Sequence, residues 1–112
     1  MLLSERFLSW AVAKYFRSLG YRVSIRRIRL DHSEIDGEAN KNGEKIAIEI
    51  KSTRDDVIRG IGQMAIALSH GYSKAVLVTP KRNSKRVDYK VLHHFNFELL
   101  TVDGYGNVHS LI

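Results

Sequence analysis

The feature that most constrains this chain is the dipeptide Asn42-Gly43, which interrupts the strand-like stretch of residues 34–51. A two-residue type I′ turn needs positive φ at both central positions, and Asn-Gly adopts it readily. The turn therefore predicts a tight antiparallel hairpin in which Lys41 faces Glu44. Every other cross-strand pair in the hairpin follows from that one.

This register brings acidic residues together on one side of the hairpin. Asp36 is predicted opposite Glu49, and Glu34 opposite Lys51; strand alternation puts all four on one face and apolar or small residues on the other. Two carboxylates directly opposite each other have side-chain roots only about 5 Å apart and destabilise a hairpin by repulsion. We therefore expect something to compensate for the Asp36–Glu49 pair.

Two kinds of compensation are open. A hard divalent cation such as Mg²⁺ prefers oxygen ligands, and it is commonly held by one or two carboxylates together with waters and a substrate phosphate. The alternative is a solvent-exposed hairpin face on which Lys51 and neighbouring basic residues neutralise the acids. The first explanation predicts a metal site, and the second predicts ordinary surface charge.

The flanking periodicities predict an α/β protein in the order α-β-β-β-α-β, followed by α-β-β. Helical periodicity covers residues 4–20 and 53–70. Between the first helix and the hairpin, residues 21–30 alternate as a strand with a bulge near Arg26 and Arg27.

The rest of the chain adds a buried strand and a terminal hairpin. Residues 74–79 form a short apolar run that Pro80 stops, which is typical of a central strand covered on both faces. A short third helix is predicted around residues 87–95, and a hairpin over residues 97–111. At 112 residues there is room for one hydrophobic core, so we expect a single domain over residues 1–112.

Composition excludes several classes of function. The chain has no cysteine, so disulfide frameworks, thiolate zinc sites and cysteine nucleophiles are ruled out. There is no apolar run of about 18 residues to span a bilayer, and Glu5 and Arg6 interrupt what would be a signal peptide, so we expect a cytoplasmic protein with no membrane partner. The formal charge of +6 favours a polyanionic partner.

The motif residues then suggest a family. Asp36, followed after a short hairpin by Glu49-Ile50-Lys51, resembles the PD-(D/E)xK nuclease superfamily, although Ile35 stands where the motif has proline. The resemblance covers roughly residues 4–80, and the predicted order αβββαβ is that of the superfamily's core. It implies a restriction-endonuclease-like core with a mixed central sheet flanked by helices, here extended by a C-terminal helix and hairpin.

The resemblance also implies roles for the motif residues. Asp36 and Glu49 would ligate Mg²⁺ or Mn²⁺ with help from the carbonyl of Ile50. Lys51 would orient the attacking water or stabilise charge on the scissile phosphate. Glu5 matches an acidic residue that resolvase-like members place in their first helix as a further ligand, although an acid at a helix start is also favourable by itself.

Two further residues, Glu34 and Gln63, are candidates for contacts that orient the metal ligands. Glu34 lies on the charged face of the predicted hairpin. Gln63 matches a helix-two glutamine of some branches, but a helical wheel places it roughly 130° from the centre of the apolar stripe and so predicts that it faces away. That stripe is formed by Val57, Ile61, Met64 and Leu68, and Ala65 also recurs at helical spacing.

The implied activity is hydrolysis of DNA phosphodiester bonds by a metal-activated water. A Holliday-junction resolvase or other repair endonuclease working as a homodimer fits the small size, because two-fold substrates suit two-fold proteins. The alternative is a non-catalytic DNA-binding module of the same fold. Basic residues that would follow the DNA backbone, unless they are merely solvated, are Arg26, Arg27, Arg29, Lys81, Arg82, Lys85 and Arg86.

Overall fold

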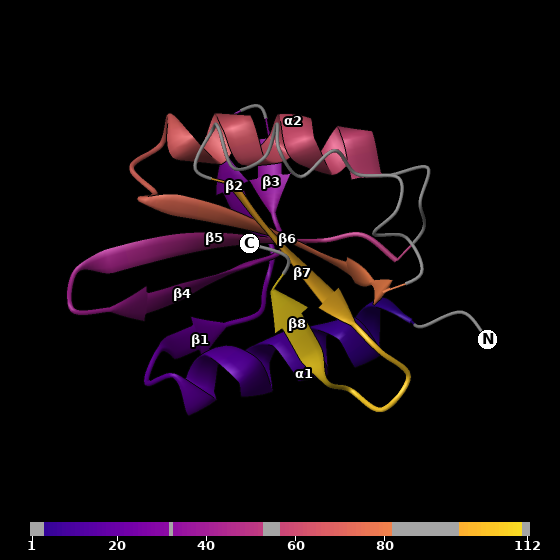
Figure 1. Ribbon diagram of the computed structural model, residues 1–112. Helices are drawn as coiled ribbons and strands as arrows, with labels where there is room; N and C mark the ends of the chain where they lie inside the picture. Colours follow the sequence, from indigo (N-terminus) through magenta and orange to yellow (C-terminus); the bar gives the residue numbers. More distant parts are fainter. Residues whose placement is uncertain (1–3, 32, 53–56, 82–96, 111–112) are drawn as a thin grey trace.

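A computed structural model describes residues 4–31, 33–52, 57–81 and 97–110 of the chain. In chain order its elements are α1 (Glu5–Ser18), β1 (Arg22–Ser24), β2 (Ile28–Leu30), β3 (Ser33–Ile35), β4 (Gly37–Lys41), β5 (Glu44–Ile50), α2 (Val57–Leu68), β6 (Lys74–Pro80), β7 (Phe97–Val102) and β8 (Val108–Ser110). The result is an α/β fold with a mixed six-stranded sheet in the order β1-β4-β5-β6-β7-β8. A two-stranded sheet, β2-β3, lies beside α2 (Figure 1).

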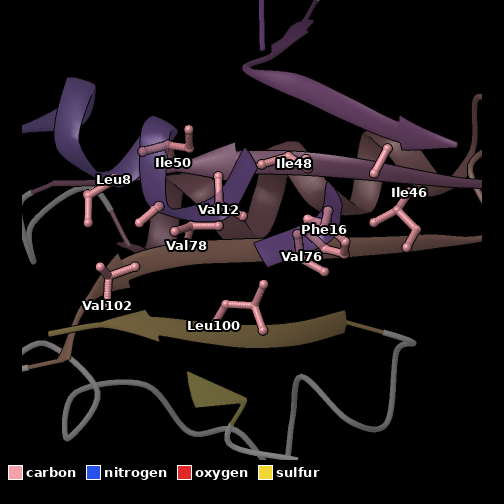
Figure 2. Close-up of a cluster of buried hydrophobic side chains, with 12 residues drawn as sticks. Leu8, Val12, Phe16, Ile46, Ile48, Ile50, Val76, Val78, Leu100 and Val102 are labelled. Atoms are coloured by element: carbon pink, nitrogen blue, oxygen red, sulfur yellow. The ribbon is translucent and has the colours of Figure 1, made fainter. Parts of the chain in front are cut away.

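The two helices cover opposite faces of the large sheet. Ser4 caps α1, since its Oγ accepts from the N–H of Phe7 at 3.1 Å, and Gly20 at φ 90° follows the helix end, as predicted. Figure 2 shows α1 packed on one face through a cluster made of Leu8, Ala11, Val12, Phe16, Ala39, Ile46, Ile48, Ile50, Val76, Val78, Leu100 and Val102. Neither described helix has the length and apolar character needed to cross a bilayer.

The opposite face carries α2 and the small sheet. Met64 and Ala67 of α2 pack there against Ala47 and Leu77 of the large sheet and Ile35 of β3. The predicted positions Ile61, Met64 and Leu68 pack against this cluster, but Ala65 is exposed. The predicted helix start at residues 53–56 lies outside the described residues.

The central hairpin has the predicted register. Asn42 and Gly43 have φ of 50° and 82°, which fits the I′ turn, and Lys41 pairs with Glu44. The same register continues to the pair of Gly37 with Ile48. The Asn-Gly turn was therefore sufficient to align β4 with β5.

Asp36 still bonds to β5, but before Asp36 the predicted hairpin is wrong, because the chain leaves the large sheet there. Glu34 pairs with Arg29 of β2 and not with Lys51. Ile35 packs on the α2 face, whereas Ala39 of the same predicted strand packs on the α1 face. The change of direction at Asp36 therefore reverses the side to which the preceding residues point.

The strand predicted over residues 21–30 is divided into β1 and β2, next to the bend at Asp36. The β1–β4 and β2–β3 ladders differ in register by one residue, which places one extra residue within 25–27, where the bulge was predicted. The bulge does more than bend a continuous strand, since it separates β1 from β2 into different sheets. Gly37 allows this close crossing, because a Cβ there would lie 2.7 Å from the carbonyl oxygen of Ser24.

The remaining strands follow the sequence pattern. β5, β6 and β7 run parallel, and β6 is covered on both faces, with Leu77 on the α2 side and Val76 on the α1 side. β7 and β8 form the predicted antiparallel terminal hairpin. The short helix predicted around residues 87–95 lies outside the described residues.

We expect Gly37→Ala to destabilise the fold by about 1–3 kcal/mol, because the added methyl group meets backbone that cannot move without shifting β1. Gly62→Ala is the matched control: a Cβ there has nothing within 4 Å, so it should stabilise α2 by about 1 kcal/mol. Chemical denaturation of both variants measures the difference. Equal stability of Gly37→Ala and the wild type would show that the crossing is looser than the structure has it.

Candidate functional site

Asp36 occupies the bend where β3 leaves the large sheet. Its N–H donates to the carbonyl of Ile48 at 3.0 Å, and its carboxylate oxygen Oδ2 accepts from the N–H of Ile50 at 2.8 Å. The side chain thus satisfies a β5 backbone donor that would otherwise need a neighbouring strand. This pair of bonds holds the Asp36 carboxyl group at the C-terminal end of β5.

Glu49 projects from β5 into the interior beneath α2. It is only 1% exposed, its Oε1 lies 3.2 Å from Nζ of Lys51, and its Oε2 meets no hydrogen-bond partner among the described residues. Buried carboxylates are rare unless they are paired or bind a metal. The surface-charge alternative is therefore wrong for Glu49, because this side of the hairpin is covered.

The two carboxyl groups interact directly. Burial and the neighbouring Asp36 carboxylate together raise the pKa of Glu49 to about 8, against the opposing effect of Lys51. At neutral pH the Glu49 side chain is therefore protonated, and the proton relieves the repulsion predicted from the hairpin register.

Lys51 follows β5 and is fixed on both its backbone and its side chain. Its N–H donates to the carbonyl of Val78 at 2.9 Å. A Cβ on Gly60 of α2 would lie 3.2 Å from Cγ of Lys51 and 2.9 Å from Cδ1 of Leu77. The absence of a side chain at Gly60 therefore lets α2 lie against the Lys51 stem.

Sequence reasoning missed Gly60. The available signal was a glycine inside a helical pattern, which costs stability unless packing requires it. Here the packing against Lys51 and Leu77 is the requirement.

Gln63 is half-buried against β3, contrary to the helical-wheel prediction that it faces away. Its Nε2 donates to the backbone carbonyl of Glu34 at 3.2 Å, and its Oε1 is buried without a partner among the described residues. The wheel failed because it was centred on large apolar residues, whereas the face of α2 that meets the sheet includes Gly60 and Ala67. Glu34 is exposed and joins the site through its carbonyl only.

The two remaining predicted ligands occupy different places. In a strand the N–H and C=O of one residue point to the same neighbour, so the Ile50 carbonyl is directed to the side on which Asp36 lies. Glu5 is an exposed residue in the first turn of α1, on the sheet face opposite Glu49. The structure thus brings Asp36, Glu49 and Ile50 together, and Glu5 has no described contact with them.

The donor set fits a hard divalent cation. Within the described ranges no cluster of three or more His, Asp or Glu side chains could enclose a metal by itself. Two carboxylates, one backbone carbonyl and waters are nevertheless a usual set for Mg²⁺, which keeps several of its own waters. The unpartnered Oε2 of Glu49 is the atom that a cation would satisfy.

The predicted basic residues divide into two groups. Arg26, Arg27 and Arg29 are exposed on and before β2, and Lys81 is exposed after β6. Since β5 and β6 are parallel and Ile50 pairs with Val78, Lys81 lies at the same end of the sheet as Lys51. The other basic candidates, Arg82, Lys85 and Arg86, lie outside the described residues.

Comparison with known proteins adds information on the fold alone. No protein-family model matches the chain, and no curated protein matches it. Its fold is similar to a solved structure titled "Crystal Structure of Protein of Unknown Function AF1548", with a TM-score of 0.63 and 16% sequence identity. The match covers 86% of this chain and 57% of the other, so this chain corresponds to little more than half of that protein.

Glu49→Gln should change how stability depends on pH. Folded Glu49 keeps its proton up to about pH 8, while in the unfolded chain it loses it near 4.5. In the absence of divalent ions the wild type therefore loses free energy of unfolding as pH rises through this window, by up to about 1.4 kcal/mol per pH unit. The glutamine variant lacks this contribution.

Denaturant unfolding at pH 5, 6, 7 and 8 measures the difference between wild type and variant. The exposed Glu5→Gln is the control and should keep the wild-type slope. Parallel curves for wild type and Glu49→Gln would contradict the buried, protonated state of Glu49.

Proposed function

We propose that this protein is a metal-dependent deoxyribonuclease of the PD-(D/E)xK type, built on a restriction-endonuclease-like core. The observation that carries the proposal is the meeting of Asp36, Glu49 and Lys51 at the end of β5, with one buried carboxylate oxygen that has no donor among the described residues. Strongly shifted carboxyl pKa values with a nearby cation are typical of functional sites.

Three groups of the chain would hold the metal: the carboxylates of Asp36 and Glu49 and the carbonyl of Ile50. When bound, Mg²⁺ or Mn²⁺ supplies Lewis-acid polarisation of the phosphodiester and a lowered pKa for a water molecule. The fixed hydrogen bond from the Ile50 N–H to Asp36 orients that carboxylate before any ligand arrives. Glu49 must release its proton to bind a cation, so metal binding and deprotonation are linked.

Lys51 provides the positive charge beside these ligands. Its ammonium lies 3.2 Å from Glu49, and its stem is confined between β5 and Gly60. An ammonium held there can donate to the attacking water or to a phosphate oxygen on which charge develops. Because the stem is packed, little side-chain freedom has to be lost during the reaction.

DNA is the substrate that the charge balance favours. The formal charge of +6 and the exposed arginines of residues 26–29 suit a phosphate backbone. Two copies acting on a two-fold substrate, as in a Holliday-junction resolvase or another repair endonuclease, would let so small a fold contact more phosphates. A DNA-binding module that does not cut would use the same basic residues but has no need for the buried acid.

Metal affinity should depend steeply on pH. Because Glu49 holds a proton up to about pH 8, the apparent Kd for Mn²⁺ should rise about tenfold for each unit by which the pH falls below 8. Isothermal titration with Mn²⁺ at pH 6, 7 and 8 measures this slope. Glu49→Gln should bind weakly and without the slope, and a wild-type Kd that is constant over this range would exclude Glu49 as a ligand.

Cleavage should require both the metal and the three side chains. With Mg²⁺ or Mn²⁺ we expect nicking of branched, linear or single-stranded DNA, and a loss of about 10²–10³-fold in rate for Asp36→Asn, Glu49→Gln and Lys51→Gln. Lys45→Gln, at the opposite end of β5, should cut normally. Cutting that persists in all three variants would remove the site, and binding without cutting under either metal would favour the non-catalytic module.

A further inference from the structure

A groove of about 600 Å³ lies between the β2–β3 hairpin and α2. It is open to solvent, and polar side chains from both elements line it. These are Arg29, Asp31, Ser33, Glu34, Arg59 and Gln63.

The two arginines of this groove make few polar contacts within the described part of the protein. The guanidinium of Arg59 has no hydrogen bond or ion pair with any described residue, and Arg29 makes only a 3.4 Å hydrogen bond to the Asp31 carbonyl. The Asp31 carboxylate is taken by His70, whose Nε2 lies 2.8 Å away. Two arginines from separate elements therefore face the groove, while one of its two acids already has a partner.

The groove and the proposed catalytic residues share two segments of the chain, because Glu34 lies two residues before Asp36 and α2 borders both. Gln63 lines it and also donates to the carbonyl of Glu34, which ties α2 to β3 at its inner end. Arg59 adjoins Gly60 in the chain, and Gly60 is the residue of α2 that packs against Lys51. A polymer bound at Lys51 and Glu49 would thus pass along α2 and enter the groove near Arg59.

We propose that this groove binds a phosphodiester of the substrate strand that neighbours the scissile one, through Arg29 and Arg59 with help from the Ser33 hydroxyl. The proposal rests on the function proposed above and adds the path of the strand: across the end of β5 and then between α2 and the β2–β3 hairpin. Guanidinium groups present a planar fork of donors that matches phosphate oxygens. An acidic peptide would meet the Glu34 carboxylate, whereas a nucleic acid strand can place its sugars and bases there.

In this arrangement the bulge at residues 25–27 helps to form the groove. By sending β2 and β3 out of the large sheet, it creates the second wall of the groove opposite α2. A continuous strand would leave Arg29 beside β4 in the sheet and away from Arg59.

The first experiment measures DNA binding without cleavage. In EDTA, fluorescence anisotropy of a labelled DNA duplex between 50 and 200 mM salt gives the slope of log K against log salt. Arg59→Gln should weaken binding about tenfold and reduce the slope by about 0.9, the value for one lost phosphate contact. Arg17→Gln, the same change on α1 at the opposite face of the sheet, should leave the slope unchanged.

The second experiment locates the contact. Substrates that carry one neutral methylphosphonate on either side of the cleaved bond are incubated with Mn²⁺. One position should slow the wild type about tenfold and should not slow Arg59→Gln any further, because the contact is already absent.

The outcomes separate the two proposals. A reduced slope in Arg59→Gln without any cutting by the wild type would support the groove as a phosphate site and reject the nuclease. If the wild type cuts DNA but Arg59→Gln keeps the wild-type salt slope and is slowed further by the methylphosphonate, the groove is not the phosphate site. The proposed nuclease activity would then still stand. An equal loss of slope in Arg17→Gln would also reject the groove, since the effect would then be one of total charge.

Discussion

The architecture depends on the bend at Asp36-Gly37, where one hairpin is shared between two sheets. The Asp36 carboxylate accepts the Ile50 N–H, so β5 loses a neighbouring strand without leaving that donor unsatisfied. Gly37 lets the β1 backbone pass closer than a side chain would allow. One polar residue and one missing Cβ therefore allow the chain to leave the large sheet between β3 and β4.

Burial makes the charged residues at this end unusual. Glu49 is enclosed beside another acid, and Lys51 offsets only part of the effect, so the carboxyl group keeps its proton near neutral pH. An apolar residue at that position would fold without this electrostatic cost. A buried acid pair that costs stability is better explained by a ligand that binds it than by the fold, and the proposed metal replaces the proton with a stronger positive charge.

Local patterns were sufficient for a large part of the fold. The Asn42-Gly43 turn predicted the β4–β5 register, Ser4 and Gly20 predicted the limits of α1, and the apolar run before Pro80 predicted a doubly covered strand. The bulge near Arg26 was also located correctly. Each of these features is controlled by backbone conformations or side-chain periods of neighbouring residues, which the sequence displays directly.

The sequence by itself determined that Asp36 and Glu49 would come together, because a two-residue turn leaves their strands no other alignment. Only the tertiary structure decided that Glu49 is buried, that Gln63 turns inward and that Glu34 leaves the large sheet for β2. The burial of Glu49 and the orientation of Gln63 depend on how closely α2 approaches β5, which the absence of a side chain at Gly60 permits, whereas the path of Glu34 depends on the bend at Asp36-Gly37. Hydrophobic periodicity reports where large apolar groups are, so it cannot register a contact made possible by a side chain that is missing.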